Sequence, residues 1–409
     1  MSTLKEVLKD VPVEWKALGE MTNFQNGKGH EKVISDNGKY IVVNSKFVST
    51  EGKVIKFSEE QLSPVFKDDI LIVMSDLPNG RALAKTFLVD KNDLYTLNQR
   101  IGRISIKNKD HIVPSFLNYI LNRSAQLLKY NNGVDQTNLK KADIENVLIP
   151  IPSPNDPEKS LTIQQEIVRI LDELTEQKNA LTEALSTEIE NRKKQYDFYR
   201  EQLFQFEGKE VEETKLGVFC KFTYGYAAKA EENGNARFVR ITDINSNGEL
   251  IASDAKFVTI NDDNKKYLLE VDDILVARTG ATFGKTMIFR ETYSAIYAGF
   301  LIKISFDKNK MLPKYYWHYT QGISYWYQAN KLVSGGGQPQ FNTGAIKEIE
   351  VPLPFPNNPQ KSLNEQAGIV SLLDKFDEAT KAIVAELEKE IELRNKEYEY
   401  YRNLLLTFK

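Results

Sequence analysis

The sequence has only one cysteine, Cys220, among 409 residues. A single cysteine cannot form a disulfide within the chain, which excludes the disulfide-built domains of secreted proteins and favours a reducing cytoplasm. Histidine is almost as scarce. The chain has three, His30, His111 and His318, and they lie far apart in the sequence. These few potential ligands show no spacing typical of a zinc site, so we expect no bound metal.

Long apolar runs are absent as well. No stretch of about 18 or more apolar residues occurs, so no membrane-spanning helix is expected. The first ten residues, MSTLKEVLKD, are charged and lack the apolar segment of a signal peptide. Hydrophobic residues still make up 41% of the chain, which is enough to build cores, and the chain length predicts two or three domains.

The sequence also lacks the positive charge that is usual in proteins that bind nucleic acid, since its net charge is −3. The charge is unevenly distributed, however. Residues 162–201 and 364–402 together hold 19 acidic and 12 basic side chains, a net charge of −7, which leaves +4 on the rest of the chain. One interpretation is mildly basic domains on acidic helices; the other is exposed helix faces that are simply rich in glutamate.

An internal repeat dominates what is present. The phrase IPIPSPNDPEKSL (149–161) returns as VPLPFPNNPQKSL (351–363), 202 positions later. A proline-rich phrase alone is usually a linker. Here the sequence that follows repeats at the same offset without a gap, so that Ile167 matches Ile369. A phrase that returns with its context indicates a chain built as two copies of one unit.

Segments before the proline phrase repeat more loosely. VEWKALGEMTNFQNG (13–27) resembles VEETKLGVFCKFTYG (211–225), and KDDILIV (67–73) resembles VDDILVA (271–277). The offset drifts in this part, so the loops differ in length between the copies. We therefore predict a variable domain at 1–150, a proline phrase with a long helix at 151–207, a second variable domain at 208–352, and a second phrase with a helix at 353–409.

The segment after each proline phrase carries a narrow apolar stripe with spacings of three and four, the pattern of a coiled-coil seam. Its members are Ile167, Leu171, Leu174, Leu181, Leu185, Ile189, Tyr196, Tyr199 and Leu203 in the first copy, and Ile369, Leu373, Phe376, Ile383, Leu387, Ile391, Tyr398, Tyr401 and Leu405 in the second. Each helix spans about 40 residues, roughly 60 Å at ~1.5 Å per residue. Because so thin a stripe needs a partner, we predict an antiparallel pair with the variable domains at opposite ends of a spacer.

The variable domains have strand-like patterns in which aromatic and β-branched residues alternate with polar ones. The candidate strands are KYIVVNSKFV, DDILIVM and GRISIKN in the first domain, and ARFVRITDI, DDILVARTG and FLIKISF in the second. A short helix is expected after Pro114 and after Pro313, and the prolines before each long helix are expected to end the preceding sheet. The predicted fold class is α+β: two mixed α/β domains with pseudo-two-fold symmetry, joined by two long helices packed as an antiparallel coiled coil.

Two loops of each domain carry side chains suited to reading bases. MSDLPNGRALAKT (74–86) and RTGATFGKT (278–286) follow the DDIL strands, and Arg81 matches Lys285 after a glycine. NNGVDQTNLKK (131–141) and SGGGQPQFNTG (334–344) lead towards the proline phrase. Arg and Lys can pair with guanine, and Asn and Gln with adenine. Ordinary turn chemistry explains Gly and Asn equally well at any one position; the recurrence of both loops in both copies favours a function.

No catalytic motif is complete. GATFGKT (280–286) has three residues between its glycines, whereas a phosphate-binding P-loop needs four. No glycine-rich cofactor loop is joined to an Asn/Asp-Pro-Pro-aromatic tetrapeptide, as an amino-methyltransferase requires. The acidic pairs Asp68–Asp69 and Asp272–Asp273 precede strands and are interpreted as turn residues and not as metal ligands. The sequence therefore indicates a chain without its own catalytic site.

The order of a variable domain, a proline phrase and a long helix, repeated once, resembles the specificity subunit of type I restriction–modification systems. The resemblance covers essentially the whole chain, and VPLPFPNNPQKSLNEQAGIVSLLD, ILVARTGATFGK and SGGGQPQFN carry it most clearly. The second copy keeps the family's Glu365–Gln366 and Ile369–Val370, whereas the first copy has Ile163–Gln164. This departure is small and leaves the assignment intact.

The resemblance implies that each variable domain reads one half of a split, asymmetric site in double-stranded DNA, and that the coiled coil sets the gap. Two modification subunits would grip the helices and methylate a flipped adenine in each half-site with S-adenosylmethionine. Restriction subunits would translocate and cleave DNA with ATP and Mg²⁺. This chain itself would bind no cofactor, would not be an enzyme, and would act in the cytoplasm, away from membranes.

Candidate contact residues follow from the loops and from the resemblance. The DNA-binding candidates are Lys28, Asn44, Lys46, Ser75, Arg81, Lys85, Gln99, Arg100, Gln136, Asn138 and Lys140 in the first copy, and Tyr224, Tyr226, Arg240, Thr242, Arg278, Thr279, Thr282, Lys285, Gln338, Gln340 and Asn342 in the second. The candidates for binding partner subunits are Tyr196, Tyr199, Arg200, Tyr398, Tyr401 and Arg402.

Other function classes stay open on the sequence alone. A coiled-coil adaptor would retain no DNA at low salt even with its partners present. A stand-alone DNA-binding protein outside a restriction system would act without modification subunits. A DNA-modifying enzyme with an unrecognised site would methylate or cut DNA without partners.

Overall fold

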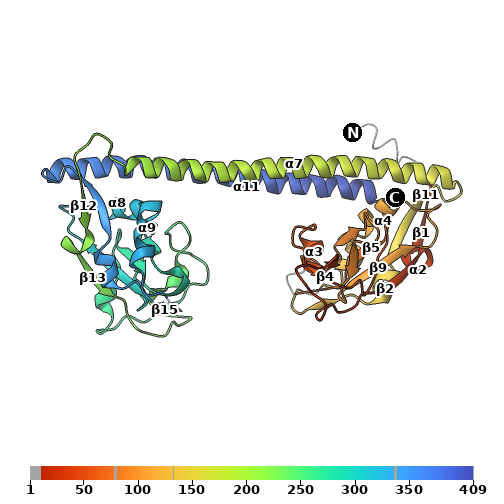
Figure 1. The fold of residues 1–409 in the computed structure, drawn as a ribbon, viewed down its shortest axis with the longest axis horizontal. Coiled ribbons are helices and arrows are strands. Elements are labelled where there is room, and N and C mark those ends of the chain that lie inside the picture. The colour runs from red at the N-terminus through yellow and green to blue at the C-terminus, as the bar shows by residue number, and fades with distance from the viewer. Residues whose placement is uncertain (1–10, 78–80, 132, 336–338, 409) are drawn as a thin grey trace. The chain divides into compact units, whose positions relative to one another are not determined.

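The computed structural model describes residues 11–77, 81–131, 133–335 and 339–408. The chain divides into two compact units (Figure 1). The first unit combines residues 1–183 with 391–409, and the second comprises residues 184–390. Each unit therefore contains one variable domain together with parts of both long helices.

In the described part of the first unit, β-strands form two sheets and two ribbons. The four-stranded sheet has the antiparallel order β2 (Thr22–Asn26), β9 (Ile101–Ile106), β5 (Ile70–Val73) and β7 (Thr86–Leu88). The three-stranded sheet has the order β4 (Phe57–Ser58), β3 (Tyr40–Val43) and β8 (Tyr95–Leu97), in which β3 and β8 are parallel. The ribbons pair β1 (Val13–Ala17) with β11 (Leu148–Pro152), and β6 (Ser75–Asp76) with β10 (Thr137–Asn138).

The second unit repeats this topology. Its four-stranded sheet has the order β13 (Cys220–Tyr224), β19 (Leu301–Phe306), β16 (Ile274–Ala277) and β17 (Thr286–Ile288). Its three-stranded sheet has the order β15 (Phe257–Val258), β14 (Ala236–Val239) and β18 (Ala295–Tyr297), and β12 (Val211–Lys215) pairs with β20 (Glu350–Pro354). Equal strand orders in the two units confirm the predicted repeat of a mixed domain.

The DDIL strand lies between two cores in each unit. In β5, Ile70 and Ile72 point into one hydrophobic cluster, while Leu71 and Val73 point into another. All four side chains are fully buried. Alternate residues of a strand face opposite sides, so a continuous apolar run is what a strand covered on both faces requires. β16 repeats the arrangement, and the loop that follows each strand therefore starts from a rigid point.

The short helices cover the sheets and connect the strands. In the first unit they are α2 (Leu18–Met21), α3 (Ser45–Ser49), α4 (Pro114–Leu121), α5 (Ala125–Leu128) and α6 (Lys141–Glu145). In the second they are α8 (Pro313–Thr320), α9 (Ile323–Leu332) and α10 (Thr343–Lys347), with the 3₁₀ turns η1 (Leu216–Val218), η2 (Ile241–Asp243), η3 (Lys265–Tyr267) and η4 (Gly280–Thr282). Helices after Pro114 and Pro313 are confirmed, each as a consecutive pair.

One strand prediction is wrong in its second half. KYIVVNSKFV begins as β3 but turns into α3, because the Asn44 side chain accepts a hydrogen bond from the Phe47 backbone N–H and caps the helix. The proline phrase also differs from a plain linker. Leu148 and the first four residues of the phrase form β11, whose Pro150 and Pro152 are accommodated because this strand pairs on one side only, with β1.

The long helices are α7 (Pro157–Leu203) and α11 (Pro359–Leu406), and they pack antiparallel (Figure 1). In the first unit the Thr175 hydroxyl of α7 donates to the Tyr398 hydroxyl of α11 at 3.0 Å. In the second unit the rings of Tyr199 and Phe376 are 5.6 Å apart. The early part of each helix thus lies beside the late part of the other, as predicted.

The apolar stripe of these helices does more than join them to each other. Near the start of each helix, Leu171 and Leu373 are fully buried and belong to the cores of the variable domains. Farther along, Leu181 and Ile383 keep 38% and 41% of their surface exposed. The strongest burial of the stripe is therefore against the domains, and the helix–helix seam is thin.

A glutamine fixes the start of each long helix to its domain. Gln164 and Gln366 are fully buried. The Gln164 side chain accepts from the Val113 N–H at 2.8 Å and donates to the His111 carbonyl at 3.1 Å. Gln366 makes the same two kinds of bond before α8. These bonds satisfy backbone groups next to a helix N-terminus, which explains why both copies carry glutamine here.

A second polar contact joins each domain to its helix at matching positions. The Tyr119 hydroxyl of α4 donates to Asp172 of α7 at 2.6 Å. In the second unit His318 of α8 occupies the place of Tyr119, with its Nε2 2.9 Å from Asp374 of α11. Lys314 also donates to Asp374, at 2.6 Å. The same attachment is thus built from two different pairs of side chains.

Candidate nucleic-acid interface

The two loops that the sequence singled out lie together in the first unit. Ser75 pairs with Asn138 and Asp76 with Thr137 in the β6–β10 ribbon. The Leu139 N–H donates to the Met74 carbonyl at 2.8 Å and extends the ribbon back to β5. Residues 61 to 65 positions apart are therefore joined into one surface element by backbone hydrogen bonds.

The second unit joins its loops in the same way. Thr279 pairs with Gln340 through an isolated antiparallel bridge, and Gln340 also pairs with Ser334. The Phe341 N–H donates to the Arg278 carbonyl at 2.8 Å. Asn138 and Gln340 are 202 positions apart, the offset of the repeat, so the pairing recurs at equivalent positions with different side chains.

One expected correspondence between the loops is wrong. The sequence matched Arg81 with Lys285, but the hydrogen bonds match Lys85 with Lys285. The carbonyl of each lysine accepts from the strand before the loop, Val73 N–H at 2.9 Å and Ala277 N–H at 2.8 Å. The residues before them, Ala84 and Gly284, share a left-handed backbone with φ of 57° and 75°. Loops of unequal length obscured this match in the sequence.

The acidic pairs before β5 and β16 are turn residues, as interpreted. Asp68 and Asp272 have φ of 72° and 71°. Asp69 accepts from the Phe66 N–H and from Arg103, both at 2.7 Å. Asp273 accepts likewise from a backbone N–H and from a lysine. Among the residues the structure describes, no group of three or more His, Cys, Asp or Glu side chains is placed to hold a metal ion.

Most candidates of the first unit are on its surface. Exposed side chains are those of Lys28, Lys46, Arg81, Gln99, Arg100, Gln136, Asn138 and Lys140. Gln136 donates to the Ser75 hydroxyl at 2.7 Å and to Asn138 at 3.3 Å. Ser75 itself is buried beneath this amide. Gln136, Ser75 and Asn138 thus form a small polar network on the ribbon.

Other candidates are committed to the fold. Asn44 caps α3, and the Lys85 ammonium donates to the Ser49 carbonyl at 3.2 Å. In the second unit Asn342 caps α10 by accepting from the N–H groups of Gly344 and Ala345. Their side chains hold the loops in place, whether or not they also touch DNA.

Arg278 has the most defined surroundings of the second-unit candidates. Its Nε donates to the Gly299 carbonyl at 3.0 Å. Its guanidinium lies over two rings, 5.3 Å from the centroid of Tyr224 and 5.5 Å from that of Phe300. Both rings are substantially exposed, by 42% and 54%. The sequence did not single out Phe300 or Gly299 as site residues; the only signal is the aromatic at the first position of the candidate strand FLIKISF, which in the structure directly precedes β19.

The remaining second-unit candidates divide by exposure. Thr242 is exposed and Tyr226 is partly buried, with its ring 5.6 Å from that of Tyr267. Thr279 is buried, and the Thr282 hydroxyl donates to its carbonyl at 3.3 Å. Gln338 lies outside the described residues.

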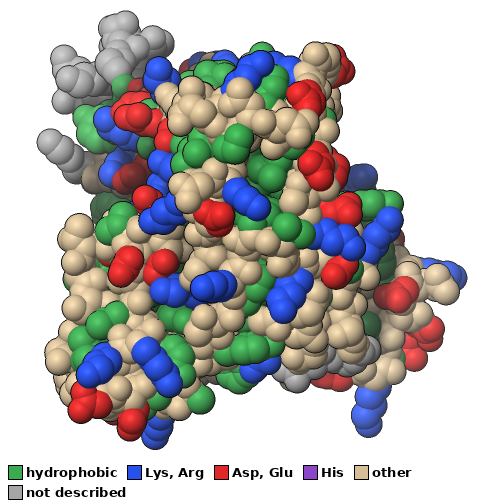
Figure 2. All heavy atoms as spheres, turned by 90° about the vertical axis from the view of Figure 1, so that its left-hand side faces the viewer, with side chains coloured by type: hydrophobic (Ala, Val, Ile, Leu, Met, Phe, Trp, Pro, Cys, Tyr) green, Lys and Arg blue, Asp and Glu red, His purple; other side chains and the backbone are tan. Residues whose placement is uncertain are grey.

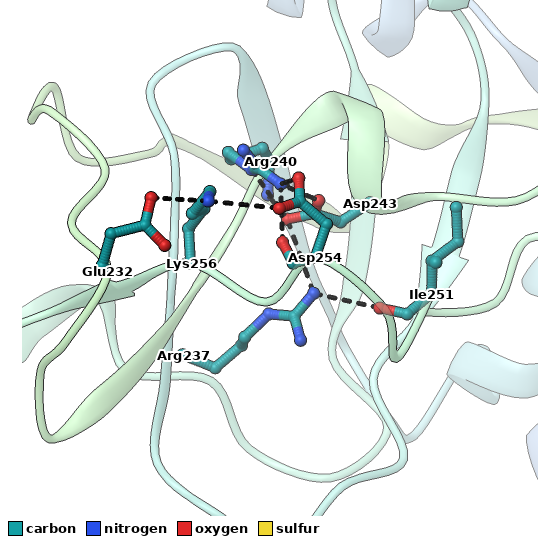
Figure 3. Close-up of polar contacts among 7 residues, drawn as sticks. All are labelled: Glu232, Arg237, Arg240, Asp243, Ile251, Asp254 and Lys256. Carbon is teal, nitrogen blue, oxygen red and sulfur yellow. Dashed lines mark hydrogen bonds and ion pairs between the residues drawn. The ribbon is translucent and has the colours of Figure 1, made fainter. Parts of the chain in front are cut away.

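Arg240, one of the DNA-binding candidates, is paired with carboxylates of its own domain. Its guanidinium donates to Asp243 at 2.7 Å and to Asp254 at 3.3 Å (Figure 3). The hydrogen bond with Asp243 raises the pKa of Arg240, although burial opposes the shift. Lys256 completes the cluster, bonded to Asp254 at 3.1 Å and to Glu232 at 2.7 Å. One partner of Arg240 lies in a turn and the other is 14 positions away in the sequence. Their ion pairs with Arg240 were therefore difficult to predict from the sequence.

The face of the second unit that Figure 2 shows has Lys and Arg interspersed with Asp and Glu, and no single sign of charge gathers there. A candidate contact on this face cannot be identified from a charged patch. It has to be identified from the donors that individual side chains leave unpaired.

Two glycines that the sequence analysis left aside hold the strand that leads into each surface. A Cβ on Gly27 would lie 2.2 Å from the Asn98 carbonyl oxygen, and a Cβ on Gly225 would lie 2.2 Å from that of Ala298. Only glycine permits this close backbone approach. The shared final glycine of the segments 13–27 and 211–225 was the available signal.

The helix residues expected to bind partner subunits fall into two groups. Arg200 and Arg402 are buried, and Arg402 donates to the carbonyls of Tyr119 and Asn122. Both arginines therefore contribute to packing within the chain. Tyr199 is 43% exposed, and the other three tyrosines are partly buried.

Comparison with known proteins agrees with this architecture. A family model for the type I restriction modification DNA specificity domain matches residues 11–191 and again residues 208–393. The chain is 29% identical to the type I restriction enzyme EcoR124I/EcoR124II specificity subunit of Escherichia coli, over 100% of this chain and 97% of the relative. It is 27% identical to a putative type I restriction enzyme specificity subunit, S.HindORF215P, of Haemophilus influenzae, over 99% and 98% of the two chains.

A solved structure from work on complex assembly and conformational transition of the type I R-M system has the same fold. It aligns with a TM-score of 0.69 at 16% identity and covers 97% of each chain. The family model accounts for most of both copies of the repeat. The chain therefore belongs to the type I restriction–modification DNA specificity family, as the non-catalytic subunit that gives such a system its DNA specificity.

Proposed function

We propose that each unit reads one half of a split DNA site through its paired loops. The observation that carries this proposal is the recurrence of one backbone pairing with unlike side chains, Ser75 with Asn138 and Thr279 with Gln340. Side chains that differ at equivalent positions of equal scaffolds suit two unlike half-sites. Phosphate contacts from the exposed lysines and arginines around these loops would fix the register on the duplex.

We further propose that α7 and α11 set the distance between the half-sites. The domain boundaries proposed for this role are 1–150 and 208–352 for the readers, and 151–207 and 353–409 for the phrase and helix segments. The most deeply buried residues of the apolar stripe pack into the variable domains and attach each helix to a domain. This attachment supports a spacer role for the helices. Readers attached at fixed points on paired helices are held at a set spacing along the duplex.

The partners proposed for this chain are double-stranded DNA, two modification subunits and restriction subunits, all in the cytoplasm. The modification subunits would bind S-adenosylmethionine and methylate adenine, and the restriction subunits would use ATP and Mg²⁺. A methylated base must leave the duplex stack, so reader and methylase have to grip the same few base pairs. The proposed helix contacts for the modification subunits remain Tyr196, Tyr199, Arg200, Tyr398, Tyr401 and Arg402.

Mapping methylated adenines across a host genome, with and without this chain, tests the proposal. We expect a bipartite motif with two unlike halves. Replacing residues 208–348 with the matching domain of a relative should change one half and leave the other half and the gap unchanged. If both halves changed together, the assignment of one half-site to each unit would be wrong. Wild-type chain expressed beside the chimera controls for the activity of the partner subunits.

A further inference from the structure

Backbone hydrogen bonds hold Arg278 in place. It directly follows β16, whose residues are fully buried between two cores. Its N–H donates to the Phe300 carbonyl at 3.0 Å, and its own carbonyl accepts from Phe341 at 2.8 Å. The side chain thus leaves the centre of the paired loops from a fixed origin.

The guanidinium is fixed at one end and unpaired at the other. Nε is used by the Gly299 carbonyl, and the rings of Tyr224 and Phe300 flank the group. Tyr224 is itself held near α10, because its hydroxyl lies 3.3 Å from that of Thr343. Among the described residues, no acceptor is recorded for Nη1 or Nη2 of Arg278 and no carboxylate pairs with it. What remains is a planar fork of two NH2 groups, Nη1 and Nη2, whose direction is set.

Arg237 and Arg240 of the same domain are paired within the domain. Arg240 is paired with two aspartates, and Arg237 is buried with its Nη2 bonded to the Ile251 carbonyl (Figure 3). The first unit has no such device, since Met74 occupies the place of Arg278 and Asn26 that of Tyr224. The fork of Arg278 is therefore not repeated at the equivalent described positions of the first unit.

The chemistry of the base edges selects one partner for this fork. Guanine presents two adjacent acceptors, O6 and N7, in the major groove, whereas adenine presents one acceptor beside a donor. A phosphate also accepts two N–H groups. A mobile side chain satisfies a phosphate from many directions, however, so three fixing contacts on one guanidinium favour a planar acceptor pair. We infer that Arg278 reads a guanine in the half-site of the second unit, an inference that rests on the proposed function.

The test uses the assembled complex with its modification subunits. The half-site of residues 208–352 is first identified by the domain exchange. Duplexes are then made with each base pair of that half-site changed in turn, and their binding is measured by fluorescence anisotropy. We expect a G·C pair at which Arg278→Ala removes discrimination, with cognate affinity falling about 5- to 150-fold, the equivalent of ~1–3 kcal/mol, and unrelated duplex binding nearly unchanged. Arg278→Gln should shift preference at that pair towards adenine, the base whose edge suits an amide.

Lys221→Ala is the matched control, because Lys221 is an exposed cation of the same domain on β13, which is separated from β16 by β19. It should leave every base preference unchanged, and thermal unfolding should show all variants to be folded. Equal loss on cognate and unrelated DNA would make Arg278 a phosphate contact and overturn the inference. So would a half-site without G·C, or retained discrimination in folded variants. If the domain exchange itself fails to change one half-site, the proposed function fails first.

Discussion

Replacing His318 with glutamine should remove a sensitivity to acid from the second unit. The His318 ring is fully buried, and its Nε2 lies 2.9 Å from Asp374. Burial lowers the pKa of His318 to about 4, although the bond to Asp374 opposes the shift. Burial alone would raise the pKa of Asp374, but hydrogen bonds from Lys314 and His318 lower it overall, so Asp374 stays ionised in the relevant range.

The sign and size follow from linkage. An unfolded histidine has a pKa of about 6.5, so between pH ~6.5 and ~4 the unfolded state binds a proton that the folded state does not. Stability therefore falls as the pH falls through this window. With folded and unfolded pKa values near 4 and 6.5, the loss on going from pH 7.5 to pH 5 is about 2 kcal/mol. The limit below pH 4 is about 3 kcal/mol at ~1.4 kcal/mol per pKa unit.

Urea denaturation followed by tryptophan fluorescence measures this loss, because the Trp317 ring lies 4.7 Å from that of His318. The wild-type chain should lose about 2 kcal/mol more than His318→Gln between pH 7.5 and pH 5. Glutamine can still donate to Asp374 but does not titrate. His111→Gln, at an exposed histidine, is the matched control and should behave as wild type. Identical pH profiles for wild type and His318→Gln would refute the reasoning.

Three further outcomes test other parts of the molecule. Gly225→Ala should destabilise the second unit by ~1–3 kcal/mol in thermal denaturation, since the added Cβ would meet the Ala298 carbonyl oxygen at 2.2 Å. The control is Gly368→Ala, whose added Cβ would have no neighbour within 4 Å and should stabilise α11 by about 0.8–1 kcal/mol. Equal effects of the two substitutions would contradict the packing argument. Gln340→Ala should weaken binding to the cognate duplex by ~1–3 kcal/mol and to unrelated duplex by less, whereas equal losses would leave it a loop-holding residue. Inserting Leu-Glu-Ala-Lys near Glu183 adds ~6 Å of helix and should lengthen the gap by one base pair in methylation maps; an active variant with an unchanged gap would show that the helices do not set the spacing.

The repeat and the long helices were predictable because their signals are local or periodic. The spacing of Leu171 and Leu174 marks a helix face without knowledge of its partner, and the constant offset of 202 reveals the second copy. The buried DDIL strands were predictable for the same reason. What the spacing did not reveal is that Leu171 packs mainly into a domain core, because periodicity gives the face of a helix but not what covers it.

The candidate site was harder to predict because its contacts join distant residues. Lys285 was matched with Arg81 since both follow a glycine, yet the left-handed residue that defines the turn is Ala84 in the first copy. The pairing of Arg240 was not visible in the sequence, because Asp254, one of its two partners, is 14 positions away. The state of a charged side chain depends on partners that only the folded chain brings near, so residue type alone overestimates the number of free cations.

The way the loops are joined explains how two unlike readers can share one scaffold. In both units the pairing uses backbone groups, with the Leu139 N–H on the Met74 carbonyl and the Phe341 N–H on the Arg278 carbonyl. Backbone hydrogen bonds do not depend on which side chains the residues carry. Met74 and Arg278 can therefore differ completely in chemistry while the loops keep the same register. The residues that fix this register are instead the buried strands, whose alternate side chains fill two cores and tolerate little change in volume. Base preference can thus diverge at the surface without a large cost in stability, which is the property that a reader of unlike half-sites requires.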